Sequence, residues 1–120
     1  MIVVRRNKST PFITKDGSEI RAILDRTNAP VRNQSLAEAT LPPGGATEGH
    51  RHPSTEEFYY VLSGRGSITV EDETQELATS EGVLIPPGSY HRLVNTGRGP
   101  LVFLCCCSPP YSDDDTVMQR

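Results

Sequence analysis

The residues best suited to chemistry are concentrated between Gly44 and Gly64, in the stretch GGATEGHRHPSTEEFYYVLSG. His50 and His52 are two residues apart, and in a β-strand such side chains lie on the same face. A carboxylate follows at Glu56 or Glu57, after a Pro-Ser-Thr turn that allows the alternation of faces to restart. Two imidazoles and a carboxylate are typical ligands of a divalent transition metal. Taken alone, the same stretch also suits solvated histidines in a polar loop.

The remaining histidine, His91, lies in a second group of spaced residues. Pro86, Pro87 and Gly88 form a turn signal that ends one strand and begins the next, which carries His91. Asn95 follows four residues after this histidine. All three histidines of the chain therefore fall within two short motifs, which favours a shared role.

Together the two groups resemble the two signature motifs of the cupin superfamily. In the first motif a glycine, a His-x-His pair, a glutamate and a second glycine occur at fixed spacing, and the chain matches every fixed position. The spacing from Gly64 selects Glu57 rather than Glu56 as the acidic residue. The second motif reads PxGxxHxxxN and is matched from Pro86 to Asn95. One position departs from the family pattern, because Ser80 stands where a glycine is expected and the nearest glycine is Gly82; we expect a reshaped turn there.

The resemblance spans about residues 36–108 and implies an all-β fold, a double-stranded β-helix of the cupin or jelly-roll type. From the residues alone, alternating strands and glycine-proline turns predict only an all-β sandwich or barrel. The implied domain organisation is a single cupin domain over residues 1–120, with an N-terminal arm at 1–30 and a polar C-terminal tail at 109–120.

The resemblance also implies one divalent transition metal, which is Fe, Mn, Ni, Zn or Cu. The implied ligands are His50, His52, Glu57 and His91. Four protein ligands leave roughly two open positions on an octahedral metal, where a small-molecule ligand such as a small carboxylate binds. The hypothesis is a metal-dependent enzyme, dioxygenase-like or an isomerase or lyase, that acts on a small organic acid or oxygenated metabolite. The alternative is a non-catalytic cupin that binds or senses a small molecule through its metal.

Strand alternation identifies further residues that could line the pocket. If Glu57 points inward on EFYYVLS, so does Tyr59, whose hydroxyl is a candidate catalytic group or a core tyrosine with a satisfied hydroxyl. Phe103 and Gln34 are candidate neighbours, and Leu93 should share the inward face of His91. Gln34 lines the pocket only if its face of the strand at 31–41 is turned inward. The competing interpretation is that this face is turned outward.

The composition of the chain limits the classes of partner that it can bind. The net charge of −3 argues against nucleic acid and against an anionic membrane surface. Hydrophobic residues make up only 35% of the chain and there is no tryptophan, so a second copy would help to stabilise it. The apolar segments MIVV and LVFL near the two ends are candidates for covering a partner, and we predict a homodimer.

The cysteines indicate a reducing compartment. Cys105, Cys106 and Cys107 are adjacent on one expected strand, where neighbours point to opposite faces, so they do not suggest a disulfide framework. The N-terminus shows no secretory pattern, and the predicted localisation is cytoplasmic. Packing is the favoured role of these thiols, and a pocket-lining thiol is the alternative.

Three local expectations concern the connecting segments. Asp16 and Glu19 fit a capping box, which predicts one helical turn, although a strand fits the following residues nearly as well. The glycines at Gly64 and Gly66 predict a hairpin that pairs SITV with the preceding strand. The acidic run at residues 113–115 is expected to be solvated.

Overall fold

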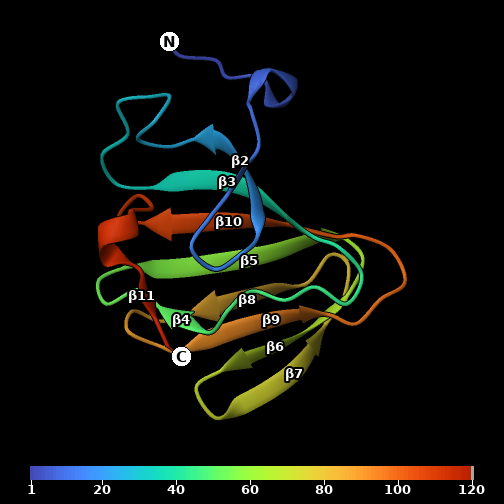
Figure 1. Cartoon of the computed structure of the whole chain (residues 1–120). Coiled ribbons are helices and arrows are strands. Elements are labelled where there is room, and N and C mark those ends of the chain that lie inside the picture. The colour runs from blue at the N-terminus through green and yellow to red at the C-terminus, as the bar shows by residue number, and fades with distance from the viewer. Residues whose placement is uncertain (120) are drawn as a thin grey trace.

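The computed structural model describes residues 1–119, which form two antiparallel sheets rolled against each other (Figure 1). The six-stranded sheet contains, in spatial order, β1 (Phe12–Ile13), β2 (Glu19–Leu24), β3 (Ser35–Leu41), β10 (Leu101–Ser108), β5 (Glu56–Ser63) and β8 (Gly82–Ile85). The five-stranded sheet contains β11 (Val117–Met118), β4 (His50–Arg51), β9 (His91–Asn95), β6 (Gly66–Val70) and β7 (Glu73–Leu77). Two short 3-10 turns, η1 (Arg6–Lys8) and η2 (Asp113–Asp115), lie near the ends of the chain. The predicted all-β fold is confirmed.

The core lies between the two sheets and follows from strict alternation along the strands. On β5 the buried residues are Glu57, Tyr59 and Val61, and the residues between them are exposed. Leu93 on β9 and Phe103 on β10 are almost completely buried from the opposing sheets. Burying each such apolar side chain contributes about 1.5–3 kcal/mol. One end of this interior is occupied by the three histidines, so the apolar core fixes the strands that carry them.

The connection from β5 to β6 differs from the predicted hairpin. β6 pairs with β7 and β9 in the five-stranded sheet, whereas β5 pairs with β10 and β8. The chain therefore changes sheets at Gly64, which has a φ of +86°. A Cβ atom at this position would lie 2.6 Å from the carbonyl oxygen of Pro100, so the turn also needs the absence of a side chain. Turn residues indicate where a chain reverses, but the sheet that receives the next strand depends on long-range packing.

The N-terminal segment also differs in part from expectation. The residues from Glu19 onward form β2, which pairs with β3, and no helical turn begins at Asp16. The Asp16 carboxylate instead accepts hydrogen bonds from Ser18 and Thr14 within a tight turn. Residues 1–4 form no strand, and the first three are exposed. A polar side chain that can cap a helix can equally close a turn, and here the strand pairing of β2 decides the outcome.

Ser80 occupies a backbone conformation that glycine adopts most readily. Its φ is +68°, in the left-handed region, while Gly82 has no positive φ and begins β8. The Ser80 amide donates a hydrogen bond to the carbonyl oxygen of Val61 at 2.9 Å, which holds the turn against β5. At this turn it is therefore Ser80, and not Gly82, that takes the left-handed conformation.

This conformation predicts that Ser80→Gly stabilises the protein. Relief of left-handed strain is worth about 1–2 kcal/mol, and the added flexibility of glycine in the unfolded chain cancels about half of it. The free energy of unfolding in urea should rise by up to about 1 kcal/mol with an unchanged m-value. Ser63→Gly, at an exposed position of β5 without positive φ, is the matched control and should lower stability. A loss of stability in Ser80→Gly similar to that in the control would contradict the assignment of strain.

Candidate metal centre

The three histidines converge because β4 and β9 are paired. His50 and His91 are directly opposite each other in this antiparallel pair, and His52 follows just after β4. All three are at most 4% exposed. The ring centroids of His50 and His91 are 4.1 Å apart. The ring centroid of His52 lies 5.0 Å from that of His50 and 5.3 Å from that of His91. One nitrogen from each ring lies within 4.8 Å of the others, which is a spacing that can hold a metal ion.

Hydrogen bonds to the main chain fix which nitrogen of each ring is available. In each histidine Nδ1 lies at hydrogen-bond distance from a main-chain carbonyl oxygen. These bonds are His50 to Glu48 at 2.7 Å, His52 to Asp115 at 3.1 Å and His91 to Ser89 at 3.0 Å. A carbonyl oxygen can only accept, so Nδ1 carries the proton in each neutral ring and Nε2 keeps its lone pair. This is the arrangement of a metal-binding histidine with an oriented ring.

Glu57 supplies an oxygen beside the same nitrogens. Its Oε1 atom lies 3.3 Å from Nε2 of His52 and 3.4 Å from Nε2 of His91. Oε2 accepts a hydrogen bond from the thiol of Cys107 at 3.1 Å. Within the described residues, Oε1 of Glu57 and Nε2 of His91 are buried without a hydrogen-bond partner. Unpaired buried polar atoms are costly, so these atoms fit a divalent cation placed between them. The neighbouring Glu56 is exposed, in agreement with the choice of Glu57.

The electrostatics of the group favour a cation. Burial alone would raise the pKa of Glu57, but the contacts with His52 and His91 outweigh it and lower this pKa to about 2. Burial opposes the protonated form of His52 as well, yet its contact with Glu57 raises the pKa above the usual 6.5. Burial and the neighbouring His91 lower the pKa of His50. The site thus holds an ionised carboxylate that attracts positive charge, either a proton on His52 or a metal ion.

A small cavity opens beside these atoms. It measures about 40 Å³ as the space open to the centre of a water molecule, several times the ~10–15 Å³ that a single water needs. The Tyr59 side chain is 2% exposed and lines this cavity. Its ring lies 5.9 Å from that of His91 and 4.9 Å from that of Phe103, which lines the same wall. The catalytic role predicted for Tyr59 stays a prediction.

Two predicted neighbours of the cavity lie elsewhere. Gln34 is exposed and precedes β3, which turns Ser35 and Ala37 toward the cavity. The sequence therefore offered the correct alternation but not the face that is buried, and the competing outward interpretation of Gln34 holds. Leu93 does point inward from β9, as alternation required, but it packs in the apolar core rather than against the cavity.

Two of the three cysteines contribute to the site. Cys105 and Cys107 line the cavity, as in the pocket-lining alternative, and they also pack as small apolar groups, since Cys107 is buried and Cys105 packs against the core. Burial and the nearby Glu57 carboxylate raise the pKa of Cys107, so it remains a thiol and can donate to Glu57. The alternation along LVFLCCCS contained this signal, since it placed both thiols on the face of Phe103.

The C-terminal segment supports the centre. The main-chain oxygen of Asp115 accepts from His52, and its carboxylate accepts hydrogen bonds from Thr55 and the amide of Ser54. The expected solvation of the acidic run holds for Asp113 and Asp114, which are exposed, but Asp115 is half-buried because η2 and β11 bring the tail back across the turn after His52. No local signal in the sequence identifies this long-range contact.

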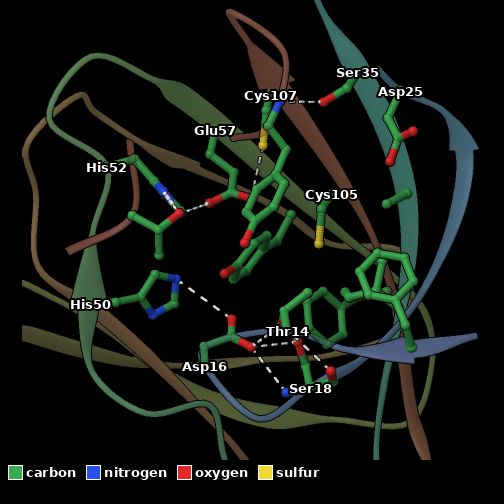
Figure 2. A pocket seen from close by; sticks show the side chains of 17 residues that line it. Thr14, Asp16, Ser18, Asp25, Ser35, His50, His52, Glu57, Cys105 and Cys107 are labelled. Atoms are coloured by element: carbon green, nitrogen blue, oxygen red, sulfur yellow. Dashed lines mark hydrogen bonds and ion pairs between the residues drawn. The ribbon is translucent and has the colours of Figure 1, made fainter. Parts of the chain in front are cut away.

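Asp16 is the other unforeseen residue. Figure 2 shows its carboxylate directed toward His50, with a dashed line to the ring, while Glu57 contacts His52. Oδ2 of Asp16 lies 3.6 Å from Nε2 of His50. The sequence suggested only a helix-capping role for Asp16, and the direction of its side chain depends on the placement of this turn over the barrel interior.

The low pKa of Glu57 predicts how the metal-free protein responds to acid. The unfolded chain binds a proton at this side chain near its usual pKa of 4.5, whereas the folded protein keeps it ionised to about 2. The stabilisation from Glu57 is therefore present above pH 4.5 and is lost as the pH falls toward 2, at up to about 1.4 kcal/mol per pH unit. Urea unfolding at about pH 5 and about pH 3 measures this loss.

Glu57→Gln should lack this component of the pH dependence, while the control Glu56→Gln, at the exposed neighbouring position, should retain it. Equal losses in the wild-type protein and Glu57→Gln would show that other groups cause the acid sensitivity.

The comparison with known families agrees with this geometry. The family model described as "Cupin domain" matches residues 37–107, from β3 to β10, and includes all four predicted ligands. The chain therefore belongs to the cupin family. It is a cupin whose three-histidine group can bind a metal ion.

Among curated proteins, the uncharacterized protein MJ1618 of Methanocaldococcus jannaschii is 44% identical over 97% of this chain and 93% of its own length. Protein SchB of Streptomyces halstedii is 37% identical over 68% of this chain, which spans 59% of that protein.

Among solved structures, an oxalate decarboxylase of Bacillus subtilis with Mn(II) centres has a TM-score of 0.81 and 28% identity, and it aligns with 95% of this chain and 31% of its own. The polyketide cyclase RemF of Streptomyces resistomycificus has a TM-score of 0.77 and 25% identity, with 96% of this chain and 89% of its own covered. Within residues 1–119, no helix is long and apolar enough to cross a membrane.

Proposed function

We propose that this cupin is a metal-dependent enzyme that acts on a small organic acid or oxygenated metabolite. One divalent ion is held by His50, His52, Glu57 and His91, and the substrate binds in the cavity beside it. When bound, such an ion acts as a Lewis acid on a carbonyl or carboxylate oxygen, or supports oxygen chemistry if it is iron.

The observation that carries this proposal is the set of unsatisfied atoms at the centre. Every Nδ1 is engaged by a carbonyl oxygen, and Oε1 of Glu57 remains unpaired among the Nε2 atoms although it is buried. A purely structural histidine cluster would be expected to satisfy these atoms within the protein. The adjoining cavity distinguishes the arrangement from a closed structural metal site, because it leaves room for a ligand.

The cavity limits the kind of ligand. Its volume of about 40 Å³ suits a molecule of only a few heavy atoms or one end of a larger molecule. Among the described residues that line it there is no lysine or arginine, so an acid bound there would be held by the metal rather than by an ion pair. Burial raises the pKa of Tyr59 well above its usual value, so its hydroxyl stays protonated and can donate to a substrate oxygen.

The similar structures support a small oxygenated ligand. The B. subtilis oxalate decarboxylase contains Mn(II), and that of Lactobacillus farciminis, at a TM-score of 0.80 and 25% identity, is a formate complex. This chain spans only 31% and 34% of those two chains. Together with the cavity size, they make small carboxylates and their neutral analogues the first ligands to test, and manganese or iron the first metals.

Tyr59→Phe tests the proposed substrate site. The variant should keep the metal content of the wild-type protein but weaken ligand binding or turnover, because only the hydroxyl is removed. The matched control is Tyr60→Phe, since Tyr60 is the next residue on β5 and points to the exposed face. Calorimetric titration with formate and a turnover screen of small carboxylates and hydroxy-carbonyl compounds provide the measurements.

Wild-type behaviour in Tyr59→Phe would remove this residue from the site. Binding of a ligand without turnover would favour the alternative of a metal-dependent sensor.

We further propose that the protein is a homodimer. Phe58, Tyr60 and Leu62 on β5 and Leu84 on β8 are each 42–52% exposed, and they form an apolar strip on the outer face of the six-stranded sheet. Such a strip suits the equivalent strip of a second copy. Light scattering at micromolar concentration should give about twice the chain mass of 13.1 kDa, and Phe58→Glu with Leu84→Glu should reduce it to that mass. A wild-type monomer would contradict the proposal.

A further inference from the structure

Asp16 reaches the metal centre from outside the part of the chain that the family model matches. It lies in the turn between β1 and β2, whereas the match covers residues 37–107. Its side chain is 14% exposed and lines the cavity together with His50, His52 and Glu57 (Figure 2). The motifs that identify the fold therefore contain no information about this residue.

The turn holds the Asp16 carboxylate in one orientation. Oδ1 accepts three hydrogen bonds, from the amide of Ser18 at 2.9 Å, from its hydroxyl at 2.6 Å and from the hydroxyl of Thr14 at 2.6 Å. The main-chain oxygen of Asp16 accepts from the amide of Glu48 at 2.7 Å, which ties the turn to the segment that leads into His50. Three donors on one oxygen direct the other oxygen away from the turn, as in a pre-positioned ligand.

The other oxygen of Asp16 faces the nitrogen of His50 that is available to a metal. Oδ2 lies 3.6 Å from Nε2 of His50, and Oε1 of Glu57 makes comparable distances of 3.3 Å and 3.4 Å to the other two histidines. Donor atoms that share a metal with bonds of about 2.0–2.2 Å lie roughly 3.0–3.4 Å apart. The centre is thus bordered by two carboxylates, one contacting His50 and the other contacting His52 and His91.

We propose that Asp16 is a fifth protein ligand of the metal, an inference that rests on the metal site proposed above. Five ligands leave roughly one open position on an octahedral ion instead of two. Two carboxylates also balance the charge of a divalent ion, which reduces the attraction of the centre for anions. The ligand class favoured by such a centre is a neutral hydroxyl or carbonyl compound over a dicarboxylate that needs two metal positions.

The test is Asp16→Asn, which retains the oxygen that accepts from Ser18 and Thr14 but replaces Oδ2 with an amide group that does not ligate. The matched control is Asp25→Asn, because Asp25 is the third carboxylate of the same cavity and accepts its hydrogen bonds from Thr27. Metal affinity is measured by chelator competition with Co(II) and Mn(II), and the ligand set by the visible spectrum of the Co(II) protein. Circular dichroism checks that each variant is folded.

The dissociation constant for the metal should rise at least about tenfold in Asp16→Asn, since even loss of an outer-shell partner typically costs 10 to 100-fold. The Co(II) spectrum should change, and at saturating metal the variant should bind formate more tightly than the wild-type protein. Asp25→Asn, which removes a charge from the cavity but no proposed ligand, should match the wild-type protein in metal affinity and in the Co(II) spectrum.

Unchanged affinity and an unchanged Co(II) spectrum in folded Asp16→Asn would overturn the inference while leaving the four-ligand site intact. Asp16 would then only accept a hydrogen bond from protonated His50. Absence of metal binding in the wild-type protein would instead reject the proposed function itself. If Asp16→Asn does not fold, Ser18→Ala replaces it: release of one donor to Oδ1 should weaken metal binding in a folded protein, and unchanged affinity would contradict the inference.

Discussion

The hydrogen bonds from the three Nδ1 atoms to main-chain carbonyl oxygens are the constraint on which the site depends. They fix the tautomer and the ring plane of each histidine and leave Nε2 as the available nitrogen of three rings whose centroids lie within 5.3 Å of one another. Two of the acceptors, at residues 48 and 89, lie two residues before the histidine they orient. The backbone that carries each histidine thus also directs it, and the geometry of the centre follows from the path of the chain around β4 and β9.

The remaining elements hold this path in place. The cross-strand pairing of His50 with His91 sets the separation of two rings, and the C-terminal segment supplies the acceptor for His52. Glu57 arrives from the other sheet, where Cys107 engages one of its oxygens and leaves the second to face the histidines. Asn95 of the second motif stabilises the barrel and not the metal site. Its side-chain amide donates to the carbonyl oxygens of Leu41 and Gly99 and so closes the loop before β10.

The sequence was sufficient to predict the barrel and the inward positions of Glu57 and Tyr59, because these follow from motif spacing and the two-residue period of a strand. It was not sufficient for features that depend on which segments meet in space. Asp16 and Asp115 come from opposite ends of the chain, and their positions at the centre depend on a turn and a tail that no local pattern directs there. The face of β3 was ambiguous for the same reason, since alternation defines two faces and only packing decides which is buried. Ser80 shows the converse, a conformation imposed by the fold on a residue that does not favour it.

The central claim is that the four residues of the two motifs form one metal site per chain, and metal stoichiometry tests it most directly. Protein purified without chelators, and metal-free protein reloaded with Mn(II), Fe(II) or Zn(II), should each contain about one ion per chain when measured by elemental analysis. The His50→Ala, His91→Ala double variant should contain almost none while its circular dichroism spectrum remains that of a β-protein. Equal metal content in the wild-type protein and the folded double variant would contradict the account.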